Sequence, residues 1–366
     1  MKPTNPVYSE ARAEQAASKP YQTIKLGLDV HADWIVVVRL LDHGSPQPAQ
    51  RFRPTELARW VQAQLEQADA VHSCYEAGPF GFGLHRELVA LGVKNVVVQP
   101  VNLDERHTGV NNDRTDAREL VLRLDRYVGG NAKAMATVRV PTPEEERLRV
   151  ESRQREQLKR EIHRVAAQGR ALLLSQGYRE RNSWWRGARW AQLVPRLPAW
   201  LIERLEIFRR ILQAIEAEEH TQNVRLCRAA PARRPKGLGG LSATVIEREV
   251  QDWGRFHNRR QVGSYTGLCG GISATGNTVR LLSITKHGNV RLRTALVELA
   301  WRMVLWQPQC HAMGKWRAVL VHPRAKPAAR KKAIVAVARQ LAVDLWRWHT
   351  GRATPEQLGW VMVGAE

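Results

Sequence analysis

The stretch TIKLGLDVHADWIVVVRLLD, residues 23–42, decides the fold of the first third of the chain. Apolar residues alternate in its first half and run together in its second half, a pattern typical of two β-strands. The residues HAD between them predict a turn, so the stretch should form a β-hairpin. Asp29 ends the first strand, directly after the apolar run KLGL. Because a carboxylate is costly to bury without a partner, Asp29 is the first candidate functional residue.

Strand and helix patterns then alternate as far as about residue 130. RFRP and ADAVHSCYEA predict strands, and VKNVVVQP predicts a short buried strand. Three segments predict helices: TELARWVQAQLEQ with Thr55 as N-cap, GFGLHRELVALG ending at Gly92, and DRTDARELVLRLDRYVGG starting near Asp113. A hairpin followed by such crossover units indicates an α/β domain with a mixed sheet, as in the ribonuclease H-like fold.

The middle of the chain has a helical pattern. Residues 130–143 are a linker with two prolines, and a long helix is predicted from Glu144 to about Ser175. Its apolar residues fall mostly in alternating steps of four and three, which is coiled-coil spacing. A helix that packs on its own domain explains this spacing equally well. The Trp- and Arg-rich segment that follows, with Trp184, Trp185 and Trp190, favours packing between helices over base stacking.

A second compact domain begins near Gly237. It contains the amphipathic helix VRLRTALVELAWRMVLW, a further helix that opens with a basic run, and the segment CGGISATGNTVRLLSITKHGN, which we interpret as a loop. We therefore expect a flexible arm at 1–20, a ribonuclease H-like domain at 21–131, a helical or coiled-coil spacer at 144–230 and a mostly α C-terminal domain at 236–350.

The charge of the chain points to a polyanionic partner. Its 57 Lys and Arg residues face 35 Asp and Glu, which gives a formal net charge of +22. An excess of this size usually serves to neutralise a polyanion, and nucleic acid is the first candidate. A membrane surface is a weaker candidate, because no basic amphipathic helix stands at either end of the chain. A basic surface without a dedicated partner is the plain alternative.

The cysteines and the hydropathy bear on the cell compartment. None of the four cysteines forms a CxxC pair, which argues against a zinc site or a disulfide framework. The N-terminus lacks an apolar signal region, and no stretch approaches the roughly 20 apolar residues of a membrane span. We therefore expect a cytoplasmic protein with no membrane association.

Four carboxylates form the candidate catalytic constellation: Asp29, Glu76, Asp113 and Asp116. Asp29 and Glu76 end predicted strands, and Asp113 and Asp116 lie three apart at a helix start, so they share a face. Carboxylates gathered at one sheet edge repel one another unless a divalent cation neutralises them, and Mg²⁺ or Mn²⁺ prefers such oxygen ligands. Taken singly, three of the four have a structural explanation: Asp113 as an N-cap, Asp116 as a first-turn helix acid and Glu76 as a surface charge.

Three segments carry a resemblance to a known family: LGLDVHADWIVVV, YEAGPFGFGLHRELVALGVKNVVVQP and NNDRTDARELVLRL. They resemble the DEDD-type transposases of the IS110/IS1111 insertion-sequence family, which includes the Piv-type DNA invertases. The resemblance continues in GLGGLSATVIEREV, QVGSYTGL and SITKHGNVRLRTALVELAW, so it covers both ends of the chain. It implies an N-terminal domain similar to the RuvC junction resolvase, with the four acids as the catalytic, metal-binding set for Mg²⁺ or Mn²⁺.

The resemblance also implies a hydroxyl nucleophile in the C-terminal domain. The family supplies a serine, directly before a glycine and ahead of the stretch that here reads SITKHGN, which would join covalently to DNA. In this chain the residue before Gly276 is Thr275, and the nearby serine is Ser273. Either hydroxyl would serve as the nucleophile, or the site is impaired, or both residues belong to a polar turn.

Two groups of cations are candidate nucleic-acid contacts. The first surrounds the hydroxyl segment and consists of Arg280, Lys286, Arg291 and Arg293. The second is a basic cluster that includes Arg330, Lys331 and Lys332. Together with backbone amides of the Gly-rich segment, they would hold phosphates.

The sequence therefore predicts a DNA transposase or recombinase that uses the acids and a C-terminal hydroxyl. The resemblance further implies a structured guide RNA, and the helical spacer suggests a homodimer or tetramer. Two alternatives remain open. One is a RuvC-like metal nuclease that hydrolyses DNA junctions, and the other is a nucleic-acid-binding derivative that has lost its nucleophile.

Overall fold

The computed structural model describes residues 19–100, 113–275 and 278–364 of the chain. The chain divides into two compact units, Met1–Pro141 and Thr142–Glu366. Most of the predicted arm, residues 1–18, lies outside the described residues. The boundary between the units falls within the linker that the sequence predicted at 130–143.

The first unit alternates strands and helices much as its sequence predicted. Its elements are β1 (Tyr21–Val30), β2 (Ile35–Leu41), β3 (Gln50–Phe52), α1 (Pro54–Gln67), β4 (Ala68–Glu76), α2 (Gly83–Ala90), β5 (Lys94–Val98) and α3 (Asp113–Val128). The prediction of Thr55 as an N-cap was wrong. The N-cap is Arg53, two residues earlier, and helix α1 begins at Pro54, because the fixed φ of proline suits the first helical position.

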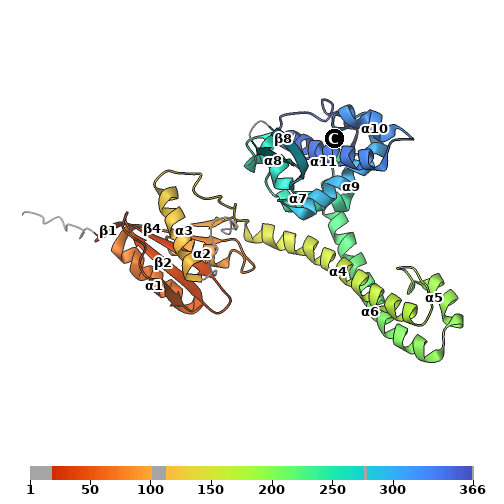
Figure 1. Ribbon diagram of the computed structural model, residues 1–366, viewed down its shortest axis with the longest axis horizontal. Helices are drawn as coiled ribbons and strands as arrows, with labels where there is room; N and C mark the ends of the chain where they lie inside the picture. The colour runs from red at the N-terminus through yellow and green to blue at the C-terminus, as the bar shows by residue number, and fades with distance from the viewer. Residues whose placement is uncertain (1–18, 101–112, 276–277, 365–366) are drawn as a thin grey trace, which may run out of the picture. The chain divides into compact units, whose positions relative to one another are not determined.

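The strands form one mixed sheet in the order β3-β2-β1-β4-β5 (Figure 1). Strands β1 and β2 pair antiparallel and form the predicted hairpin, and β3 adds antiparallel to β2. Strands β4 and β5 extend the other side of β1 in parallel. The expected mixed sheet is thus confirmed.

Alternate residues of β1 face opposite sides of the sheet. The side chains of Ile24, Leu26 and Leu28 are fully buried, in a cluster that also contains Leu57 of α1 and Leu88 of α2. The odd-numbered residues of β1 face the side that α3 covers, where Ala117 and Val121 pack against β2. The sheet is therefore a middle layer between α3 and the pair α1 and α2.

The second unit starts with two long helices. These are α4 (Pro143–Ser175) and α6 (Ala199–Arg228), joined through the short helices α5 (Gly187–Leu193) and η2 (Val194–Arg196). Thr142 and Glu145 form a capping box that starts α4. In Figure 1 α4 and α6 run side by side, and contacts within this one chain bury part of their apolar residues, among them Ile162 of α4 and Leu212 of α6. Of the two explanations for the helical spacing, this packing favours a helix that packs within its own chain.

The tryptophans of the α4–α6 region lie in its core, as predicted. Trp184, Trp185 and Trp190 are between 0% and 7% exposed. The Trp184 indole nitrogen donates to the carbonyl oxygen of Ala166, 3.0 Å away. Gly169 makes room for this ring, because a Cβ atom there would lie 2.1 Å from it. These indoles are therefore not available to stack on bases.

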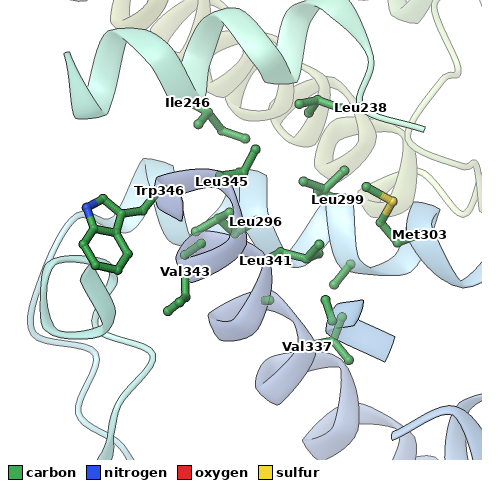
Figure 2. Packing of buried hydrophobic residues seen from close by; sticks show 14 of the residues in the cluster. Leu238, Ile246, Leu296, Leu299, Met303, Val337, Leu341, Val343, Leu345 and Trp346 are labelled. Atoms are coloured by element: carbon green, nitrogen blue, oxygen red, sulfur yellow. The ribbon is translucent and has the colours of Figure 1, made fainter. Parts of the chain in front are cut away.

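The rest of the second unit is mostly helical. Its elements are β6 (Arg234–Pro235), α7 (Gly240–Val250), η3 (Trp253–Arg255), α8 (Arg259–Thr266), β7 (Gly270–Thr275), β8 (Thr278–Ile284), α9 (Val290–Trp306), η4 (His311–Trp316), α10 (Arg317–Val321), α11 (Pro327–His349) and β9 (Met362–Val363). Figure 2 shows the core, where Leu296 and Leu299 of α9 meet Leu341 and Leu345 of α11.

One segment of this unit differs from its predicted structure. Residues 269–289 were interpreted as a loop, but β7 and β8 form an antiparallel hairpin within them. The glycines and hydroxyls that suggested a loop sit on strands, because ladder hydrogen bonds between the two strands override the local preference of these residues. Among the described residues, no helix is long and apolar enough to span a membrane.

Candidate active site

The strand register brings two of the four predicted acids together. Leu28 of β1 and Tyr75 of β4 are partners in the parallel ladder. Asp29 and Glu76 are the next residues of the two strands, so they occupy neighbouring positions at the same end of the sheet. Both side chains are partly buried.

Both acids face the side of the sheet that α3 covers. The ammonium of Lys25 lies 2.8 Å from a carboxylate oxygen of Asp125 in α3, and side chains two residues apart on a strand share a face. On β4, the thiol of Cys74 donates to the carbonyl oxygen of Leu120 in α3, at 3.5 Å. Asp29 follows Lys25 by four residues and Glu76 follows Cys74 by two, so both lie on the α3 face.

The direction of α3 carries its first turn to the same end of the sheet. Asp125, near the end of α3, pairs with Lys25 near the start of β1. Farther along the strand, a Cβ atom on Gly27 would lie 2.2 Å from the carbonyl oxygen of Ala117. Helix α3 therefore runs antiparallel to β1. One more step along both elements leads to Asp29 on the strand and to the helix start, where Asp113 and Asp116 lie.

Buried groups behind the acids give this end of the sheet a low polarity. Burial raises the pKa of the Cys74 thiol well above its ordinary value, and the nearby charge of Glu76 raises it further. The Cys74 thiol, buried between β4 and α3, thus stays neutral beside Glu76. Low polarity strengthens the interaction of carboxylates with any cation that binds them.

A histidine that the sequence analysis missed contacts one of the acids. The Nε2 atom of His31 lies 3.0 Å from Oδ2 of Asp29, with the His31 side chain 35% exposed. His31 comes from the turn between β1 and β2. The sequence did contain a signal for His31: it follows the aspartate at the strand end by two residues and lies within the predicted HAD turn.

The structure brings the predicted acids to one end of the sheet without showing a complete metal cluster. Among the described side chains, no group of three or more His, Cys, Asp or Glu residues is placed to hold a metal ion. The Asp113 side chain lies outside the described ones. The donor chemistry fits Mg²⁺ or Mn²⁺, because all four side chains offer carboxylate oxygens.

The candidate nucleophiles lie on the β7–β8 hairpin. Ser273 is exposed and stands opposite Arg280 in the ladder, so the hydroxyl and the guanidinium emerge on one face of the hairpin. Thr275 is the last residue of β7 and stands opposite Thr278, which shares that face. The Thr275 side chain lies outside the described ones. A hydroxyl beside a guanidinium suits a reaction at a phosphate.

The predicted nucleic-acid contacts divide into two groups in the structure. Arg280, Lys286, Lys331 and Lys332 are exposed. The other three make contacts within the protein. The Arg291 guanidinium pairs with Glu156 of α4, the Arg293 guanidinium donates to the carbonyl oxygens of Thr266 and Lys286 at 3.0 and 3.2 Å, and the Arg330 guanidinium donates to that of Leu320 at 3.3 Å.

The sequence is similar to that of known transposases. The sequence profile of the transposase family IS116/IS110/IS902 matches residues 231–315. The protein y4rJ of Sinorhizobium fredii (strain NBRC 101917 / NGR234), provisionally named a transposase, is 32% identical over 324 residues, 81% of each chain. The transposase for insertion sequence element IS1111A of Coxiella burnetii (strain RSA 493 / Nine Mile phase I) is 31% identical over 119 residues, 32% of each chain.

Proposed function

Because this chain belongs to the IS110/IS1111 family of transposases, we propose that it cuts and rejoins DNA strands with its N-terminal acids and a hydroxyl of the β7–β8 hairpin. The observation that carries the proposal is the register Leu28↔Tyr75, which makes Asp29 and Glu76 neighbours at the end of the sheet where α3 begins. We further propose a RuvC-like, ribonuclease H-like first unit, which the strand order β3-β2-β1-β4-β5 supports.

The acids are the proposed metal-binding groups. Asp29, Glu76, Asp113 and Asp116 would hold Mg²⁺ or Mn²⁺, which when bound supplies charge that polarises a phosphodiester oxygen. His31 would act as a positioning residue, because its imidazole contacts Oδ2 of Asp29 and restricts that carboxylate. Lys25 and Asp125 would hold α3, and with it Asp113 and Asp116, in register with β1.

The hydroxyl of Ser273 or Thr275 is the proposed nucleophile. Its oxygen would form a bond to a DNA phosphorus while the bond from that phosphorus to a deoxyribose oxygen breaks. The hydroxyl proton would pass to the leaving oxygen, so the products are a phosphate ester on the protein and a free DNA hydroxyl. The reverse step with a different DNA hydroxyl would rejoin the strands. Arg280, opposite Ser273, would offset the charge of the phosphate.

The proposal includes a guide RNA and a homo-oligomer. A net charge of +22 is compatible with RNA as well as DNA, and strand exchange requires several DNA ends to be held at once. If an RNA is bound, the purified protein should carry a discrete RNA that ribonuclease removes. Purification of a fully active protein that carries no RNA would contradict the guide. Light scattering of the protein would give the number of copies.

A transposition assay tests the central proposal. The element's ends, its flanking noncoding DNA and a target plasmid would be supplied to cells with wild-type protein or with Asp29→Asn. We expect the substitution to abolish strand joining while the folded protein accumulates normally. Asp69→Asn is the matched control, because Asp69 is exposed and stands at the other end of the sheet on β4. Full activity of Asp29→Asn would refute the assignment of the acids.

Two further readouts separate the alternative functions. A denaturation-resistant protein–DNA adduct would exclude a nuclease that works by hydrolysis alone. Thr275, which stands where the family has serine, favours the idea of a binding protein that has lost its nucleophile. Strand cutting that requires Mg²⁺ would exclude that idea, and salt-sensitive binding without cutting would support it.

A further inference from the structure

A large cavity lies in the C-terminal part of the second unit, and Ser273 is not among the residues that line it. Its volume is about 1350 Å³, and it is lined by residues from α8, β8, η4 and α11. Three of these elements, α8, β8 and α11, are labelled together at the C-terminal end of the chain in Figure 1. The cavity is large enough to hold several nucleotides, far more than a single ion would fill.

The lining of the cavity is strongly cationic. Eight of its residues are Lys or Arg, and none is Asp or Glu. Within the described parts of the chain, one of these eight lies near a carboxylate: Nη1 of Arg347 is 4.0 Å from Oδ1 of Asp344. The other cations, among them Arg259, Lys331 and Arg339, are exposed. So many like charges facing one cavity are destabilising unless a polyanion occupies it.

A buried carboxylate, that of Asp344, orients a further side chain of the cavity lining, His311. Asp344 of α11 is fully buried, and its Oδ2 atom lies 2.9 Å from Nδ1 of His311, whose side chain is 46% exposed. The Gln340 amide also donates to Asp344, at 2.9 Å. These contacts occupy the Asp344 carboxylate and orient the imidazole of His311, which lines the cavity, so that the doubly protonated ring would present its Nε2–H to an anionic ligand.

An aromatic side chain adds a stacking surface to the charge. Trp316 lines the cavity and is half-buried, with the Lys315 ammonium 5.4 Å from its ring centroid. Trp346 lines it as well, but that ring is covered by the Arg352 guanidinium at 4.3 Å. Unpaired bases stack on indole rings, while the phosphates of the same strand bind Lys and Arg.

We propose that this cavity binds a phosphodiester strand of nucleic acid, with phosphates on Arg259, Arg339, Lys331 and His311 and an unpaired base against Trp316. Leu282, Ser283 and Ile284 of β8 form part of its wall, and the same hairpin carries Ser273 and Arg280. A strand held in the cavity is therefore attached next to the hairpin that bears the candidate nucleophiles. The inference deepens the proposed function, on which it rests for the kind of ligand.

Binding to the full-length protein tests the proposal, without metal so that no strand is cut. Fluorescence anisotropy would compare labelled single-stranded DNA, single-stranded RNA and duplex DNA over a range of salt concentrations. The test variant is Arg259→Gln/Arg339→Gln. The matched control is Arg204→Gln/Arg210→Gln, which removes the same charge from exposed positions on α6.

We expect the test variant to lose roughly twentyfold in affinity for a single strand at 0.1 M salt, with a salt slope smaller by about 1.4. The control should bind like wild type. A greater loss with DNA assigns the cavity to the substrate strand, and a greater loss with RNA assigns it to a guide. Equal losses in test and control variants would overturn the proposal, because they would show binding by general surface charge.

Variants of Trp316 test the proposed contact with a base. Trp316→Leu should weaken single-strand binding by at least about fivefold and leave the salt slope unchanged, and Trp316→Phe should restore most of the affinity. If Trp316→Leu weakens the binding of single strands and of duplex DNA equally, the proposed contact between Trp316 and an unpaired base is refuted. The binding measurements do not depend on the outcome of the Asp29→Asn transposition assay. The cavity proposal and the proposed catalytic function can therefore fail independently.

Discussion

Gly27 of β1 lies directly beneath Ala117 of α3, so closely that a Cβ atom on the glycine would be 2.2 Å from the Ala117 carbonyl oxygen and 2.6 Å from the Val121 amide nitrogen. The missing side chain lets the helix backbone rest on the strand. This contact, together with the Lys25–Asp125 ion pair, sets where the first turn of α3 lies relative to Asp29. The geometry of the candidate acid site thus depends on a residue that carries no chemistry.

Gly27→Ala should therefore destabilise the first unit by about 1–3 kcal/mol or more, because the added methyl group has to push α3 away from the sheet. Transposition should fall with it, since Asp113 and Asp116 move with the helix. Thermal unfolding and the transposition assay would measure both effects. Gly83→Ala is the control, because a Cβ atom there meets nothing within 4 Å. Equal behaviour of the two variants would contradict the close contact.

His31→Ala should lower transposition by about 10- to 100-fold without unfolding the protein, because Asp29 loses a group that orients it. More divalent metal should then be needed to reach half-maximal activity, whereas a surface role for His31 would leave that concentration unchanged. His31→Gln keeps a hydrogen-bonding group and should recover part of the activity. A metal titration of all three proteins would distinguish these outcomes.

The double variant Ser273→Ala/Thr275→Ala should form no denaturation-resistant adduct with DNA, because both candidate oxygens are gone. One of the two single variants should also lose the adduct, and that variant names the nucleophile. Thr278→Ala removes a third hydroxyl from the same hairpin face and should have no effect. An adduct that survives in the double variant would place the nucleophile elsewhere. If the wild-type protein forms no adduct, adduct formation by Thr275→Ser would show that the threonine impairs the site.

Asp125→Ala should destabilise the first unit by about 2 kcal/mol or more, since it leaves the ammonium of Lys25 without its carboxylate. Lys25 is 1% exposed and Asp125 27%, so solvent screens this pair only in part. Replacing both residues, as Lys25→Met/Asp125→Leu, should recover much of the loss. Melting temperatures would show this, and a double variant as unstable as Asp125→Ala would contradict a charge effect.

Arg291→Gln should lower the melting temperature at pH 7, because this guanidinium joins α9 to Glu156 of α4. Burial alone would raise the pKa of the Glu156 carboxyl, but hydrogen bonds from Arg160 and Arg291 outweigh burial and hold the pKa below its ordinary value. The pair therefore stabilises the fold above the ordinary pKa of a glutamate and loses this effect as the pH falls through the lowered value.

The difference in melting temperature between wild type and Arg291→Gln should accordingly shrink in acid. Arg280→Gln is the comparison, because Arg280 is exposed on the hairpin. It should leave the melting temperature unchanged at every pH and weaken DNA binding. The opposite pattern, with Arg291 important for DNA and neutral for stability, would show that its contact with Glu156 does not form in solution.

Much of the first unit could be predicted because its patterns are local. Alternating or continuous runs of apolar residues marked β1, β2, β4 and β5, and the ends of these runs placed Asp29 and Glu76 at strand ends. The β7–β8 hairpin was not predicted, because local patterns alone do not reveal it. Its glycines and hydroxyls prefer turns when judged residue by residue, and only pairing across the hairpin makes them strands.

The sequence by itself determined the alternation of strands and helices, the acids at their ends, the excess of positive charge and the family. The tertiary structure decided which of these residues meet. It paired Leu28 with Tyr75, turned Arg291 and Arg293 toward partners inside the protein, and gathered Arg259 and Arg339, 80 positions apart, around one cavity. The physical reason is that periodic patterns record how each segment is buried, whereas contacts between distant segments depend on side-chain packing and backbone approach.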